Sequence, residues 1–186
     1  MSILKVARMG HPVLRARARA IDVGEIKSSR IQQLIDDMFE TMKEYHGVGL
    51  AAPQVHASIR LFVAGFAPDP DGEEDEERVP LMTVINPEIT VAGAEMGEDW
   101  EGCLSIPDIR GKVPRARRIV LRAFDRKGKR FELQASGFTA RVIQHETDHL
   151  DGVLFFDRMS SFATLTFLEE FGRYWSERGA RPVREE

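Results

Sequence analysis

Apolar residues recur at every third or fourth position over residues 28–47, and this period predicts an amphipathic helix. Ser28 or Ser29 can cap its first turn, and Gly47 can end it. The same period over residues 137–152 and 161–179 predicts two further helices. The apolar stripe of the first helix is Ile31, Leu34, Ile35, Met38, Phe39 and Met42, and that of the last is Leu165, Leu168, Phe171 and Trp175.

Short runs rich in β-branched and aromatic residues predict strands between these helices. The strands cover residues 59–66, 81–90, 117–124 and 130–136, and "DRKGKR" forms a hairpin turn between the last two. Two segments are expected to be loops: "GVGLAAPQ" (47–54) and the acidic segment 67–80. We therefore predict an α+β fold, in which mainly antiparallel sheets surround the helix over residues 137–152.

Length and composition set further bounds. The 186 residues suffice for one domain, 1–186, that buries its own core. A net charge of −4 argues against a general affinity for DNA or RNA phosphates. No apolar run approaches the ~20 residues that span a bilayer, so we expect no membrane contact. The first 21 residues contain four arginines and no acid. Because "GHP" favours a turn there, we interpret them as a folded arm rather than a targeting peptide.

The string "QHETDHL" (144–150) carries the clearest chemistry. His145 and His149 are four residues apart and share one face of the predicted helix, together with Phe138 and Val142. Two imidazoles with Glu146 beside them suit a metal site that activates water. The alternative is a pair of half-buried structural histidines. Asp148 is expected to support His149 or to pair with an arginine of "PRARR" (114–118).

A third ligand is needed, because two histidines do not complete a metal site. Metallopeptidases with this motif place the third ligand downstream, but no histidine follows His149. The other donor is Cys103 in "EGCLSIP" (101–107), which would give a Cys-His-His site with one open position. A nucleophilic Cys–His pair stays open, although it gives Glu146 no role. As the one cysteine, Cys103 forms no internal disulfide, so we expect a reducing compartment such as the cytoplasm.

In "GVGLAAPQ", two residues suit a substrate site. Gly49 would let a substrate backbone approach closely, and Gln54 offers an amide donor to an oxyanion. The alternative is a tight buried turn after the first helix.

Together and in this order, "GVGLAAPQ", "EGCLSIP" and "QHETDHL" resemble the signatures of the peptide deformylases. The likeness extends from "MGHPVLR" near the start to "DGVLF" after the His-containing helix. The resemblance implies removal of the formyl group from the N-terminal formyl-methionine of newly made polypeptides, with release of formate. It assigns the metal to Cys103, His145 and His149, and the usual metal is Fe²⁺, which Zn²⁺, Ni²⁺ or Co²⁺ can replace.

The resemblance also implies a mechanism. Glu146 accepts a proton as water attacks the formyl carbon, and returns it to the departing amine. Gln54 and the backbone N–H of Leu104, with the metal, meet the developing oxyanion. The substrate lies extended beside residues that we list as candidate contacts: Val48, Gly49, Gly102 and Val142, with Glu101 and Arg110 for support or peptide contact.

The implied partners are nascent formyl-methionyl polypeptides, and the place where these emerge implies a transient encounter with the ribosome. The predicted C-terminal helix mixes arginines with glutamates, so we expect it to pack or self-associate rather than bind RNA. The segment 67–80 is an insertion relative to compact members of the family and is expected to reshape only a rim. Two other functions remain open: a metallopeptidase and a catalytically lapsed metal-binding module.

Overall fold

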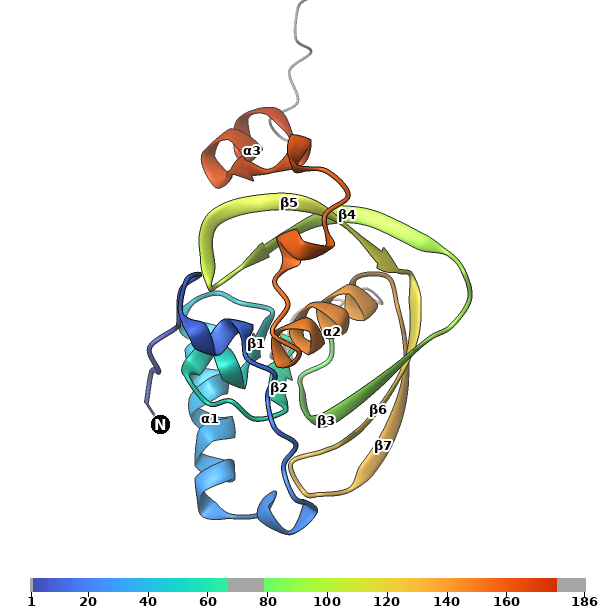
Figure 1. Cartoon of the computed structure of the whole chain (residues 1–186). Coiled ribbons are helices and arrows are strands. Elements are labelled where there is room, and N and C mark those ends of the chain that lie inside the picture. The colour runs from blue at the N-terminus through green and yellow to red at the C-terminus, as the bar shows by residue number, and fades with distance from the viewer. Residues whose placement is uncertain (1, 67–78, 177–186) are drawn as a thin grey trace, which may run out of the picture.

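A computed structural model describes residues 2–66 and 79–176 (Figure 1). The acidic segment 67–80 therefore lies almost entirely outside the described residues. Helix α1 covers Ser29–Glu44. Ser28 caps it, because its side chain accepts a hydrogen bond from the N–H of Ile31, as the sequence predicted. The helix ends earlier than Gly47. His46 takes the left-handed conformation with φ of 53°, and the N–H of Gly47 donates to the carbonyl of Met42 over 2.8 Å.

Five strands form the larger sheet, in the order β1-β2-β3-β6-β7, and every neighbouring pair is antiparallel. The strands are β1 (Gly49–Ala51), β2 (Leu61–Ala64), β3 (Met82–Val91), β6 (Arg118–Phe124) and β7 (Arg130–Ser136). The four predicted strands are confirmed. The prediction of a loop over 47–54 is wrong, because Gly49–Ala51 pairs with Phe62–Ala64 as an edge strand.

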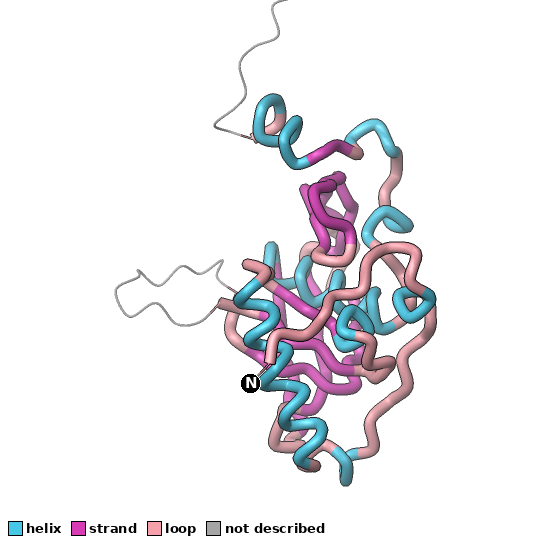
Figure 2. The backbone as a smooth tube through the Cα atoms, turned by 90° about the vertical axis from the view of Figure 1, so that its left-hand side faces the viewer, coloured by secondary structure: helices cyan, strands magenta, loops and turns pink. Residues whose placement is uncertain are grey.

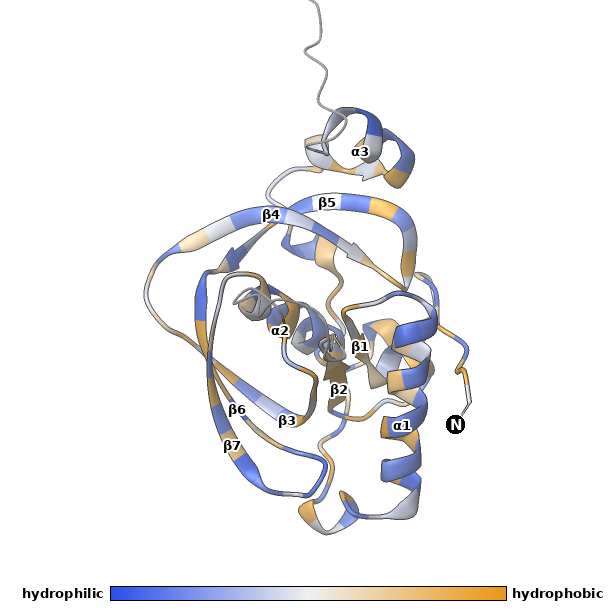
Figure 3. Cartoon of the chain, turned by 180° about the vertical axis from the view of Figure 1, so that it is seen from behind, coloured by the Kyte–Doolittle hydropathy of each residue, from blue (hydrophilic) through white to orange (hydrophobic). Residues whose placement is uncertain are grey.

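Helix α1 packs on this sheet through its apolar stripe. Figure 3 shows its apolar positions on the side that faces β1 and β2. Ile31, Ile35 and Met38 are buried against Leu61 and Ile85. Each such side chain contributes about 1.5–3 kcal/mol through loss of apolar surface from water.

The second sheet has the order β4-β5-β8, with β4 (Met96–Cys103), β5 (Ile106–Ala116) and β8 (Thr166–Phe167). Neither β4 nor β5 was among the strands predicted from the sequence. The long β4–β5 hairpin arches over helix α2 (Gly137–Leu150), and the larger sheet lies on the other side (Figure 1). Helix α2 contacts β1, β2, β5 and β7, so it is the central element of the α+β fold, as predicted.

The C-terminal helix is shorter than the predicted 161–179. Ser161 caps a 3₁₀ turn over Phe162–Thr164, Thr166–Phe167 pairs with β5, and α3 covers only Leu168–Tyr174. Strand pairing therefore interrupts the helical period, and residues 177–179 lie outside the described part. Among the residues that the structure describes, no helix has the length and apolar character needed to cross a bilayer.

Candidate active site

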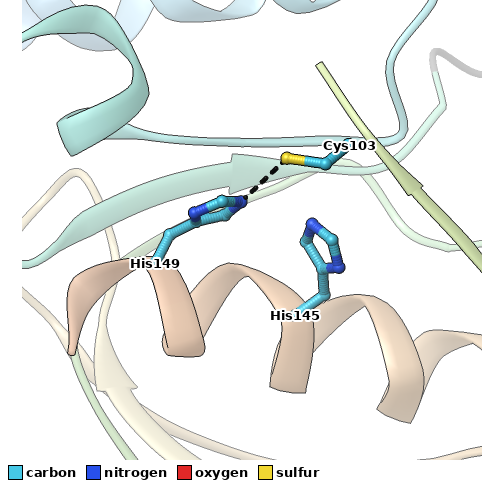
Figure 4. A group of neighbouring side chains, drawn as sticks. All are labelled: Cys103, His145 and His149. Atoms are coloured by element: carbon cyan, nitrogen blue, oxygen red, sulfur yellow. Dashed lines mark hydrogen bonds between the residues drawn. The ribbon is translucent and has the colours of Figure 1, made fainter. Parts of the chain in front are cut away.

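Helix α2 and the tip of the β4–β5 hairpin bring Cys103, His145 and His149 together. His145 and His149 project from the same face of α2, and the Cys103 thiol, at the end of β4, lies across from them next to His149 (Figure 4). The Cys103 Sγ lies 3.2 Å from Nε2 of His149, and one ligand atom from each residue falls within 4.8 Å of the others. All three residues are buried. The grouping that the sequence predicted is thus present.

These three donors fit a divalent transition metal. A thiolate and two imidazoles within reach of one ion suit several first-row metals. Burial raises the pKa of the Cys103 thiol, but the charge of His149 and hydrogen bonds from His145 and His149 outweigh it and place the pKa well below its ordinary value. The protein therefore favours the thiolate, which is the form that binds metal.

Glu101 orients His145 from behind. Its Oε2 lies 2.9 Å from Nδ1 of His145, which leaves Nε2 of that ring for the ligand group. Arg115 Nε and Arg141 Nη1 donate to Glu101 Oε1 over 2.9 Å and 2.8 Å. Burial raises the pKa of Glu101, but the hydrogen bonds from His145 and Arg115 prevail and lower it to about 2. Glu101 is therefore buried and ionised, and it fixes the orientation of the His145 ring.

Asp148 extends this network, as the sequence predicted. Arg115 Nη1 donates to Asp148 Oδ2, and Arg158 Nη2 donates to Asp148 Oδ1 over 2.7 Å. Arg115 thus bridges Glu101 and Asp148, and together with Arg141 and Arg158 it compensates these two buried carboxylates. Asp148 is itself buried, which excludes the role of an ordinary surface carboxylate.

Glu146 differs from these paired carboxylates. Its Oε2 is buried and has no hydrogen-bond partner among the described residues. Burial raises the pKa of Glu146 to about 7; the charges of His145 and His149 oppose this rise, and those of Cys103 and Glu101 add to it. A carboxyl group with such a pKa can both accept and release a proton near neutral pH.

Gly49 provides the space that Glu146 occupies. A Cβ atom at Gly49 would lie 2.3 Å from Oε1 of Glu146, closer than atoms can approach. Gly49 was predicted to admit a substrate backbone, and the structure shows that its missing side chain leaves room for the Glu146 carboxylate. Gly102 makes room in the same way for Arg110, whose Nη1 would lie 2.1 Å from an added Cβ.

Gln54 points its amide toward Cys103. Its Oε1 accepts from the N–H of Ala51 over 2.8 Å, which fixes the side chain. Its Nε2 then lies 3.2 Å from Ser105 Oγ and 3.5 Å from Cys103 Sγ. Leu104 follows Cys103 in the two-residue turn between β4 and β5. A donor amide and this turn therefore flank the ligand group.

A cavity of about 780 Å³ opens onto this site. His145, Glu146, Gln54 and Leu104 line it, whereas His149 lies behind them with 1% of its surface exposed. The six residues predicted to contact substrate all line it: Val48, Gly49, Glu101, Gly102, Arg110 and Val142. A concave site of this size can hold an extended peptide end.

Comparison with known proteins agrees with this geometry. A family model described as "Polypeptide deformylase" matches residues 3–164. The chain belongs to the peptide deformylase family. Peptide deformylase 2 of Nostoc sp. is 43% identical over 169 residues, which cover 91% of this chain and 93% of that protein. Peptide deformylase 1A, chloroplastic/mitochondrial, of Arabidopsis thaliana is 42% identical over 163 residues, which cover 83% of this chain and 61% of that protein.

A solved structure gives the same answer. The class I type b peptide deformylase of Acinetobacter baumannii, bound to Met-Ala-Ser, superposes with a TM-score of 0.76 at 40% identity. The match covers 86% of this chain and all of that one. The deformylase described here is thus a metal-dependent hydrolase that removes the formyl group from the N-terminal formyl-methionine of nascent peptides. The family membership sets aside the metallopeptidase and the lapsed module.

Among the residues of the deformylase cavity that were not proposed from the sequence are three aromatic residues and one leucine: Tyr45, Trp100, Phe138 and Leu168. Phe138 left a signal, because it is one helical turn before Val142 on the predicted helix. Trp100 left none, since the strand that carries it was not predicted. Leu168 left none, because its position depends on the pairing of β8 with β5.

Proposed function

We propose that Glu146 is the proton carrier of deformylation and that Cys103, His145 and His149 hold the metal ion. The observation that carries this proposal is the buried, unpartnered carboxylate of Glu146 beside three clustered donor atoms. A divalent ion bound there would supply a Lewis acid that polarises the formyl oxygen and lowers the pKa of water. Glu146 accepts a proton from the attacking water and delivers it to the departing amine.

The oxyanion that develops on the formyl oxygen needs donors fixed in advance. We assign these to Nε2 of Gln54 and the backbone N–H of Leu104. The amide of Gln54 is held by its bond to the N–H of Ala51, so its orientation costs little during the reaction. Removal of one such donor costs roughly 10²–10³-fold in turnover in other hydrolases.

The substrate is proposed to lie extended between two backbone segments, one at Val48–Gly49 and one at Gly102. Val48 and Val142 would form the apolar pocket for the methionine side chain, and both line the cavity. Arg110 lies against Gly102 and would contact the peptide further along.

Fe²⁺ is the proposed physiological metal, with Zn²⁺, Ni²⁺ or Co²⁺ able to replace it, because a Cys-His-His set suits each of them. We further propose that residues 1–186 act as one catalytic domain in the cytoplasm. The protein would bind nascent formyl-methionyl chains during a transient encounter with the ribosome. Metal analysis of anaerobically purified protein and fractionation of the source cells test the metal and the compartment.

A peptide assay tests the reaction itself. Formyl-Met-Ala-Ser is incubated with the anaerobically prepared protein, and formate and peptide mass are followed together. Deformylation predicts equal amounts of formate and intact Met-Ala-Ser. Cleavage between amino acids without formate would contradict the proposal and favour a metallopeptidase.

A further inference from the structure

Leu168 lines the catalytic cavity although it lies beyond the residues that the family model matches, which end at residue 164. It is the first residue of α3 and follows directly on β8. The register of β8 on β5 places Phe167 opposite Ile109 and Thr166 opposite Arg110. This pairing brings the C-terminal segment, defined here as Thr166–Trp175, to the wall of the active site.

An aromatic cluster holds the C-terminal segment in place. The ring of Trp100 on β4 lies 4.9 Å from the ring of Phe171 and 5.5 Å from that of Trp175. Lys112 Nζ lies 5.6 Å from the centre of the Trp100 ring, within the range of a cation–π contact. Trp100 also lines the cavity, so one side chain joins the C-terminal segment to the catalytic wall. Figure 2 shows this segment beyond the β4–β5 strands, at the end of the molecule opposite the N-terminal end of α1.

The wall of the cavity carries large apolar side chains that are exposed to solvent. Tyr45, Phe138 and Leu168 line it from three different elements, yet 46%, 40% and 40% of their surfaces are exposed. Large apolar side chains left in water around a concave site are typical of a surface that binds a ligand. The metal-ligand group lies deeper, so a formyl-methionine held there leaves the rim to the residues that follow it.

The spacing along β4 identifies those residues. Trp100 is three positions before Cys103, which corresponds to at most about 10 Å of strand, because the register shifts between Glu101 and Cys103. An extended peptide rises by about the same amount per residue, so the wall at Trp100 and Leu168 lies about three residues from the formyl group, at the second residue after the formyl-methionine or the one beyond it. The charged lining residues Lys5 and Arg8 belong to the N-terminal arm, which is bonded at Ser105 on the other side of Cys103.

We propose that Leu168 is a specificity-determining residue, and that it contacts an apolar side chain at the second or third residue after the formyl-methionine. The proposal rests on the deformylase activity and adds a preference that the C-terminal segment imposes. Phe171 acts as a positioning residue, because it holds Leu168 against the cavity through Trp100.

Matched peptides test this preference. Formyl-Met peptides with Leu or Ser at each of the three following positions are compared by the kcat/KM of formate release. The wild-type protein should prefer Leu over Ser about 10-fold at the second or third position, the range expected for an apolar pocket contact. Leu168→Ala should reduce this preference to about twofold, mainly through KM, because the contact is the same in the ground and transition states. The dipeptide formyl-Met-Ala should be deformylated at the same rate by both proteins.

Phe167→Ala is the matched control. Phe167 is adjacent, 66% exposed and not among the cavity residues, so its substitution should keep the preference. Phe171→Ala should reproduce the Leu168→Ala result and change the near-ultraviolet circular dichroism of the tryptophans. An equal Leu-to-Ser ratio at both positions in the wild-type and Leu168→Ala proteins would overturn the proposal, as would an equal loss on formyl-Met-Ala. Absence of formate from every peptide with the wild-type protein would instead contradict the activity on which the proposal rests.

Discussion

Oε2 of Glu101 lies 2.9 Å from Nδ1 of His145, and two arginines hold the same carboxylate from the other side. Glu101 therefore has two roles: it positions His145, and it compensates the buried positive charges of Arg115 and Arg141. Glu101→Gln should lower metal affinity about 10–100-fold, as loss of such a partner does elsewhere. It should also lower the free energy of unfolding of the metal-free protein by about 3–5 kcal/mol, because Arg115 and Arg141 lose a buried counter-charge.

Titration with a metal chelator and urea unfolding measure these two effects of Glu101→Gln. Glu132→Gln is the control, since its pair with Arg122 has both side chains about half exposed. That variant should change the free energy of unfolding by less than about 1 kcal/mol. Equal effects of both variants would contradict the role given to Glu101.

Glu146→Gln keeps the size of the side chain but removes its ability to accept a proton. We expect turnover to fall about 10²–10⁴-fold, while the metal content after dialysis stays at one ion per chain. The ligands Cys103, His145 and His149 are untouched in this variant. Formate release and elemental analysis of the same sample make the measurement. Near-normal turnover would remove Glu146 from proton transfer.

Gly49→Ala should act on catalysis through sterics alone. The new Cβ would meet Oε1 of Glu146 at 2.3 Å, so the carboxylate must move. A displacement of about 1 Å in a reacting group can cost about 10²-fold in kcat, and we expect a loss of that order with metal content unchanged. Gly24→Ala is the control, because an added Cβ there meets no atom within 4 Å. If both variants retain full kcat, Glu146 has more freedom than the structure indicates.

Cys103→Ser should weaken metal binding, because a serine hydroxyl does not ionise near neutral pH as the thiol of Cys103 does. In protein loaded with Co²⁺, the near-ultraviolet absorption from a thiolate–cobalt bond should be present in the wild type and absent in Cys103→Ser. Persistence of that absorption would show that another group supplies the sulfur contact, and Cys103 would not be a ligand.

Asp157 should contribute to acid stability. It accepts hydrogen bonds from Arg15 and from the N–H of Leu154, and these outweigh the effect of burial and lower its pKa. The pKa of Asp157 in the folded state lies below its unfolded value of about 3.9. The ionised carboxylate therefore stabilises the fold fully above the unfolded pKa, and this stabilisation disappears as the pH falls through the folded pKa. Asp157→Asn should therefore flatten the dependence of unfolding free energy on pH below about pH 4. Arg15→Gln should give part of the same change; no change in either variant would contradict the linkage.

Local sequence was sufficient where local physics decides the structure. The apolar period of residues 28–47 predicts a helix, and the β-branched and aromatic residues on either side of the "DRKGKR" turn predict the hairpin of 117–136. The His145–His149 spacing likewise places both rings on one helical face. Cys103 was predicted from ligand counting, and the hairpin of β4 and β5 brings it to the histidines.

Strand pairing between distant parts of the chain determines the elements that were not predicted. Strand β4 is rich in acidic residues and glycine, and β5 contains Pro107 and Pro114, so neither has the composition of a strand. They are strands because they pair with each other over most of their length. The pairing of Thr166–Phe167 with β5 likewise cuts the predicted C-terminal helix and places Leu168 at the cavity, which no local pattern indicates.

The ligand set also has a mechanical consequence. Cys103 belongs to the β4–β5 sheet, whereas His145 and His149 belong to the helix that packs on the other sheet. A bound ion would therefore be a crosslink between two layers of the protein, closing a loop of more than 40 residues. Removal of the ion should loosen the β4–β5 hairpin before the remainder of the protein unfolds. Amide hydrogen exchange should therefore accelerate first in that hairpin, while α1 and the five-stranded sheet keep their protection.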